Sequence, residues 1–182
     1  FDFQLDVEHR VEGRAVVVTA EVVNRDHRVM PFGIGFHPAF SWPLPGAGGQ
    51  KHFIDLDEGG APALHRLSGG LVNPQPLPSP FAEGRLELDH SLFAEDAMLF
   101  PEGAGAGLVY GPEKGPRVHF TWENLPNLAL WSKSVAGFVC LEPWHGTAAE
   151  VGGSDDLGER PYSELLGPGA RARFSFKAEL RG

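Results

Sequence analysis

Among the eight histidines, one lies in aromatic and apolar surroundings and is the first candidate for chemistry. His37 belongs to residues 35–40, which read G-F-H-P-A-F, and Pro38 holds the histidine in an extended conformation. An imidazole titrates near neutral pH, which suits the transfer of a proton. The same surroundings are typical of a buried histidine whose ring nitrogens are hydrogen-bonded in a core. The segment alone leaves both interpretations open.

A carboxylate ends an apolar run in the second half of the chain. Residues 138–144 read F-V-C-L-E-P-W, so Glu142 directly follows apolar residues. Burying a carboxylate is costly unless it is paired or used, and burial raises its pKa toward the range of a general base. The alternative is a glutamate that leaves the core at the end of a strand. Trp144 beside it is either a stacking surface for a sugar ring or ordinary packing.

The sequence contains no strong metal or nucleotide motif. Glu142 and His145 have the E-x-x-H spacing that binds metals on helices, but Pro143 between them disfavours a helix. Cys140 is the only cysteine, so we expect neither an internal disulfide nor a cysteine-based metal site. The glycine-rich stretches lack the G-K-[ST] of a phosphate-binding loop. We therefore expect no metal and no cofactor.

Two aspartates are candidates for holding hydroxyl groups. Asp89 follows the alternating residues 85–88, and Asp96 lies in the next segment. A carboxylate accepts hydrogen bonds from hydroxyl groups, which is how proteins hold sugars. On spacing alone, an acid at a helix N-terminus or on the surface is the more common explanation of both residues.

Strands must position these side chains, because the composition leaves little room for helices. The 182 residues include 24 glycines and 16 prolines, well above average usage. Alternation predicts that residues 1–8 form a half-buried strand. In the last strand it predicts a buried face of Phe174, Phe176, Ala178 and Leu180. About nine strands with turns between them indicate one all-β domain over residues 1–182, an antiparallel sandwich or barrel. They are expected at residues 1–8, 14–24, 52–56, 85–88, 107–110, 117–122, 128–132, 138–142 and 171–180.

The net charge of the chain limits which classes of molecule it can bind. The formal net charge is −9 and no basic run is present, so nucleic acid and anionic membrane surfaces are excluded as partners. No apolar run approaches the roughly 20 residues of a membrane helix, and no signal peptide is recognised. We expect a cytoplasmic protein that binds a small molecule.

Three segments carry a family resemblance. Residues 30–40 read MPFGIGFHPAF, residues 92–100 read LFAEDAMLF and residues 138–146 read FVCLEPWHG. In this order they resemble the histidine, middle and glutamate segments of the aldose 1-epimerase (galactose mutarotase-like) family, in its LacX-type branch. The resemblance runs through nearly the whole chain. It implies the large antiparallel β-sandwich, or supersandwich, of galactose mutarotases.

The resemblance also implies an activity and residue roles. The reaction would be interconversion of the α and β anomers of a hexose or related aldose, without a cofactor. Glu142 would take the proton of the anomeric hydroxyl group, and His37 would protonate the ring oxygen. Asp89, as first choice, or Asp96 would bind the sugar together with Phe40 and Trp144.

The chain departs from the family in one respect. Family members carry an N-terminal portion that supplies an arginine and a further histidine to the sugar site, and neither motif is found here. We therefore expect the chain to be the C-terminal part of such a protein. Its expected partners are a sugar, phosphorylated or not, and either an N-terminal segment or another copy of the chain.

Two other functions compete with the isomerase. A non-catalytic carbohydrate-binding β-sandwich would hold a sugar through Trp42, Trp144 and acidic side chains. A structural sandwich fragment would pair with a separately encoded N-terminal piece. The combination of His37 and Glu142 favours the isomerase, because binding alone requires no acid–base pair.

Overall fold

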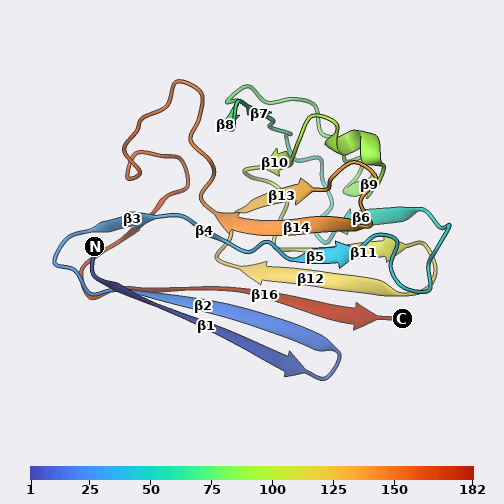
Figure 1. Cartoon of the computed structure of the whole chain (residues 1–182), viewed down its shortest axis with the longest axis horizontal. Coiled ribbons are helices and arrows are strands. Elements are labelled where there is room, and N and C mark those ends of the chain that lie inside the picture. Colours follow the sequence, from blue (N-terminus) through green and yellow to red (C-terminus); the bar gives the residue numbers. More distant parts are fainter.

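Antiparallel strands are the main regular elements of the computed structural model, which describes all residues 1–182 (Figure 1). The larger sheet has seven strands in the order β1-β2-β16-β12-β11-β6-β9. These strands are β1 (Phe3–Glu12), β2 (Ala15–Asn24), β16 (Arg171–Arg181), β12 (Arg117–Glu123), β11 (Gly107–Pro112), β6 (His52–Leu56) and β9 (Arg85–Glu87).

The second sheet has five strands and carries the candidate residues. Its order is β10-β13-β14-β4, and β5 also pairs with β14. The strands are β10 (Met98–Phe100), β13 (Asn127–Trp131), β14 (Phe138–His145), β4 (Ile34–Gly35) and β5 (Ala39–Ser41). Two small sheets join β15 (Glu164–Leu166) to β3 (Met30–Phe32) and β7 (Leu67–Ser68) to β8 (Leu71–Val72). The expected antiparallel β-sandwich is confirmed.

One short 3₁₀ helix, η1 (His90–Phe93), is the only helical element. None of the chain's helical structure has the length or apolar character needed to span a bilayer.

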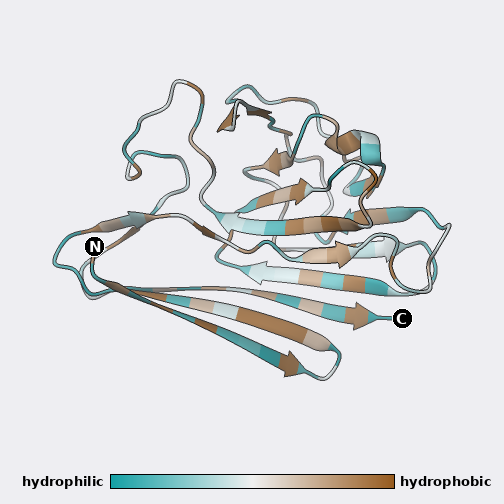
Figure 2. Ribbon diagram, in the orientation of Figure 1, coloured by the Kyte–Doolittle hydropathy of each residue, from teal (hydrophilic) through white to brown (hydrophobic).

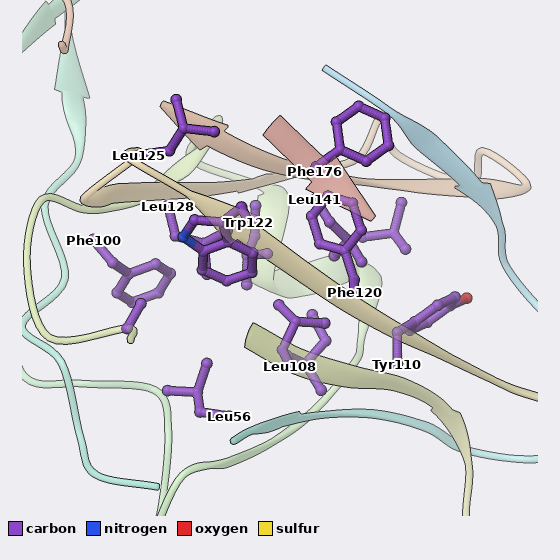
Figure 3. Close-up of a cluster of buried hydrophobic side chains, with 14 of the residues drawn as sticks. Leu56, Phe100, Leu108, Tyr110, Phe120, Trp122, Leu125, Leu128, Leu141 and Phe176 are labelled. Atoms are coloured by element: carbon purple, nitrogen blue, oxygen red, sulfur yellow. The ribbon is translucent and has the colours of Figure 1, made fainter. Parts of the chain in front are cut away.

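The hydrophobic core joins the two sheets (Figure 3). The larger sheet contributes Leu108, Phe120 and Phe176, and the smaller sheet contributes Leu128 and Leu141. In β12 burial alternates residue by residue, as its period of two predicts. The core thus supports one face of the five-stranded sheet. On the other face a smaller buried cluster of Val72, Ala97, Leu99 and Ala129 covers part of the sheet, and the candidate site lies beside it.

Two expectations about buried faces are wrong. Phe3, Leu5 and Val7 on β1 are 54%, 49% and 51% exposed, because they line open pockets beside the hairpin and do not reach the core cluster. Figure 2 shows a largely apolar β2 and a β1 with many hydrophilic segments, in a hairpin at the edge of the sandwich. In β16, Phe174 is buried as expected, but Leu180 is 54% exposed because the core cluster reaches only as far as Ala178.

Candidate active site

The strand that carries Glu142 is longer than the sequence indicates. β14 continues through Pro143 to His145, so Glu142 lies inside a strand and does not leave the core at a strand end. Because side chains alternate along a strand, Cys140, Glu142 and Trp144 share one face. The intervening Leu141 belongs to the hydrophobic core on the other face.

The backbone around His37 is held against the middle of β14. β4 pairs with the C-terminal end of β14, and β5 pairs with its N-terminal half. In the link between them, the backbone N–H of Phe36 donates to the carbonyl oxygen of Pro143 (3.1 Å), and that of Leu141 donates to Pro38 (3.2 Å). His37, between these two anchors, is therefore brought opposite the centre of β14.

The structure brings His37 and Glu142 into contact. Nε2 of His37 lies 3.2 Å from Oε1 of Glu142. The Glu142 side chain is only 3% exposed, whereas the His37 side chain is 60% exposed. Although the two atoms are close enough for an ion pair, their geometry is not that of a hydrogen bond, and Oε1 has no hydrogen-bond partner in the chain.

Burial sets the proton affinity of Glu142. Removal from water disfavours the charged carboxylate and raises the pKa of Glu142 to about 7. A carboxyl group with such a pKa can accept a proton near neutral pH and give it back. Beside it stands an imidazole that solvent or a ligand can reach. The pair is therefore suited to moving protons to and from a bound molecule.

A cleft of about 440 Å³ opens beside this pair. Its lining includes His37, Trp144 and the loop residues Thr147, Arg160 and Ser163. Such a volume falls in the range of small-molecule pockets. Glu142 is buried and lines neither this cleft nor a larger cavity of about 560 Å³, but His37 and Trp144 line only the smaller of the two, so we place the candidate site there.

Gly35 determines where the Trp144 ring lies. A Cβ atom on Gly35 would lie 2.2 Å from Cδ1 of Trp144, so only glycine lets the indole lie against β4. We expect Gly35→Ala to lower the free energy of unfolding by about 1–3 kcal/mol, measured by urea denaturation. In a Trp144→Ala background the same change should cost little, because the clash is gone.

A matched control for this prediction is Gly167→Ala. An added Cβ there meets nothing within 4 Å, so its effect on the free energy of unfolding should be small. Equal destabilisation by both substitutions would contradict the role given to Gly35.

The two aspartates lie outside the cleft. Asp89 is the N-cap of η1, where its Oδ1 accepts a hydrogen bond from the backbone N–H of Ser91 (2.8 Å). Hydrogen bonding by the side chain and then the backbone of Ser91 lowers the pKa of Asp89. Asp96 accepts a hydrogen bond from the backbone N–H of Ala97 (2.9 Å). Both are exposed, and neither lines the cleft beside His37. Their assignment to sugar binding stays a prediction.

Of the aromatic candidates, the structure brings only Trp144 to the cleft. The Phe40 ring packs against Phe120 at a centroid distance of 5.6 Å, as part of the core. Trp42 packs against His90 at 4.2 Å. These contacts give Phe40 and Trp42 structural roles, and sugar binding by Phe40 stays a prediction.

Sequence reasoning missed two residues at the site. The Trp131 ring lies 6.2 Å from that of His37, and Arg160 lines the cleft. Trp131 could have been found, since Leu128 and Leu130 alternate toward the core and leave Trp131 on the site's face. Arg160 lies in an irregular loop whose pattern gives no signal.

His145 serves a different purpose from Glu142. Its Nε2 lies 3.3 Å from Oε2 of Glu164, and its ring packs against Phe174. Since positions three apart on a strand face opposite sides, Glu142 and His145 do not form a joint site.

Sequence comparison finds relatives of this chain among LacX proteins. The chain is 30% identical over 172 residues to the chromosomal LacX protein of Lactococcus lactis. The match covers 88% of this chain, and the chain spans 56% of LacX. No model of a known protein family matches the chain.

Solved structures with the same fold cover nearly the whole chain. A galactose mutarotase related enzyme from Lactobacillus acidophilus superposes with a TM-score of 0.89 at 20% identity, covering 99% of this chain and 62% of that one. A galactose mutarotase-like protein from Lactobacillus casei gives 0.84 at 25% identity, covering 100% and 64%. The chain therefore has the galactose mutarotase-like fold, and its resemblance to the aldose 1-epimerase family and to LacX proteins is confirmed.

Proposed function

We propose that the protein containing this chain interconverts the α and β anomers of an aldose, and that the reaction takes place in the cleft beside His37. The observation that carries the proposal is the contact of 3.2 Å between the exposed imidazole of His37 and the buried carboxyl group of Glu142. The anomeric oxygen and the ring oxygen of an aldose are bonded to the same carbon. An acid and a base that serve both oxygens must therefore stand next to each other.

In the proposed mechanism, protons move between the sugar and these two side chains. Glu142 takes the proton of the anomeric hydroxyl group while His37 donates one to the ring oxygen, and the bond between C1 and the ring oxygen breaks. Rotation about C1–C2 then presents the other face of the aldehyde. Ring closure returns a proton from the new hydroxyl group to His37, and Glu142 gives its proton to the former carbonyl oxygen. Both side chains end in their starting states.

Only part of the sugar site is proposed to lie in this chain. The chain spans only 56% of LacX. We therefore propose the activity for the whole protein and not for these 182 residues alone. The family's arginine and second histidine would come from an N-terminal portion, or a second copy of the chain would complete the cleft. A cytoplasmic location and a role in carbohydrate metabolism are further parts of this proposal.

The pH dependence of the rate tests the base. Glu142 must be ionised to accept a proton, and burial raises its pKa to about 7 from the ordinary value of 4.5. We therefore expect kcat/KM for anomer exchange to fall about tenfold per pH unit below pH 7, measured by polarimetry in the presence of a chelator. A rate that stays constant down to about pH 5 would contradict Glu142 as the base, since an ordinary carboxylate titrates lower.

A carbohydrate-binding domain without activity is the second candidate function. The position of Trp144 in the cleft favours it, since an indole can stack on a sugar ring. Binding of an aldose without faster anomer exchange in the whole protein would favour this function over the isomerase.

A further inference from the structure

A third side chain joins His37 and Glu142 on the site's face of β14. Cys140 is a buried free thiol, two positions before Glu142 on the same face. One donor atom from each of the three side chains lies within 4.8 Å of the others. The cluster therefore combines sulfur, imidazole nitrogen and carboxylate oxygen at one point of the sheet.

One of these donors lacks a partner. Oε1 of Glu142 is buried and accepts no hydrogen bond. Leaving a buried polar atom unsatisfied is costly, so something outside the chain can gain free energy by binding there. The exposed ring of His37 is the side from which it can approach.

The chemistry of the donors selects the kind of ligand. Thiolate and imidazole ligands suit Zn²⁺, whereas Mg²⁺ and Ca²⁺ take oxygen ligands only. Three protein ligands leave a fourth position of a tetrahedral ion open. Metal sites are recognised in a sequence by helical spacing of ligands or by pairs of cysteines. A site that takes a sulfur, a nitrogen and an oxygen from a strand and a distant loop has neither signature.

We propose that His37, Cys140 and Glu142 form an inhibitory binding site for Zn²⁺. The bound ion occupies the nitrogen and the oxygen that would otherwise exchange protons with a sugar. The inhibition rests on the proposed function, whereas the binding of Zn²⁺ does not.

Binding is tested on the 182-residue chain itself, in competition with a chromophoric Zn²⁺ chelator. We expect Cys140→Ala to weaken the affinity for Zn²⁺ by at least about 100-fold, since loss of groups that only orient a ligand already costs about 10- to 100-fold. Co²⁺ in place of Zn²⁺ should give a thiolate charge-transfer absorption band that the variant lacks. Thermal unfolding of the metal-free variant verifies that it is folded, and Cys140→Ser serves as a second variant of the same shape.

His119→Gln is the matched control. His119 is also an imidazole in contact with a carboxylate, since its Nε2 lies 2.7 Å from Oδ2 of Asp57, but no cysteine is near it. This variant should bind Zn²⁺ as the unaltered chain does. Equal affinity in the chain and in Cys140→Ala, or a Co²⁺ complex without the thiolate band, would overturn the site.

Inhibition is measured in the whole protein by anomer exchange with and without Zn²⁺. We expect loss of activity that a chelator reverses, at a Zn²⁺ concentration that rises by at least about 100-fold in Cys140→Ala, in proportion to its affinity. Full activity at saturating Zn²⁺ would overturn the inhibitory role. Inactivity of the metal-free protein would contradict the proposed isomerase, while the binding result would still decide the Zn²⁺ site.

Discussion

Replacing Glu142 with glutamine should lower the rate of anomer exchange in the whole protein by about 10²–10⁴-fold. The amide has nearly the same shape as the carboxyl group but cannot accept the proton of the anomeric hydroxyl group. Exchange between anomers is followed by NMR, or by polarimetry of a freshly dissolved aldose. Sugar affinity should change far less than the rate, because the loss is confined to proton transfer.

The free energy of unfolding shows whether the loss of activity in Glu142→Gln comes from the missing base or from misfolding. The pKa of Glu142 is about 7 in the folded protein, above its ordinary value of 4.5, so its protonated form favours folding. That contribution is fully present below about pH 4.5 and is lost as the pH rises through 7. Glutamine stays neutral throughout. Glu142→Gln should therefore be at least as stable as the original protein in urea at about pH 8, with a smaller difference at about pH 5.

Glu8→Gln is the control for the stability measurement, because Glu8 is an exposed residue on β1. It should change neither the rate nor the free energy of unfolding appreciably. A Glu142→Gln protein that unfolds more easily at both pH values would mean that the carboxyl group has a structural role, and its inactivity would then prove nothing about a base.

The sequence predicts strands well where both faces of a strand have defined surroundings. In β12, alternation gives the buried face correctly, and in β16 Phe174 and Phe176 are buried as expected, although Ser175 on the opposite face is buried as well. On β1 the same alternation identifies the apolar face but not its burial. Hydropathy shows which side chains would gain from being covered, and only the assembled structure shows whether anything covers them.

The candidate site is less accessible to sequence reasoning, because it depends on strand pairing. His37 and Glu142 come together since β4 and β5 both pair with β14, and no local pattern contains that information. The family resemblance supplied this pair. The shared face of Cys140 and Glu142 follows from period two within the predicted strand 138–142, but the closeness of both to His37 depends on the pairing of β4 and β5 with β14. Arg160 lines the cleft from an irregular loop, where the sequence has no strand or helix periodicity from which its position could be predicted.

Replacing His37 with asparagine should remove the proton donor for the ring oxygen and lower the rate of anomer exchange by about 10²–10⁴-fold. Asparagine can donate a hydrogen bond to the ring oxygen but cannot transfer a proton to it. Because the His37 side chain is 60% exposed, the change should alter the free energy of unfolding by no more than about 0.5 kcal/mol. The rate and urea denaturation of the same preparation test both statements.

Chemical rescue distinguishes a proton donor from a residue that only positions Glu142. In His37→Ala, added imidazole can enter from the exposed side and should restore part of the rate, whereas it should not rescue Glu142→Gln. His27→Ala, at an imidazole whose side chain is 90% exposed and which does not line the cleft, should leave the rate unchanged. The double variant Glu142→Gln with His37→Asn should be little slower than either single variant, because both residues act in one proton-transfer cycle. Fully multiplied losses, together with no rescue by imidazole, would contradict that cycle and leave His37 as a residue that only binds the sugar.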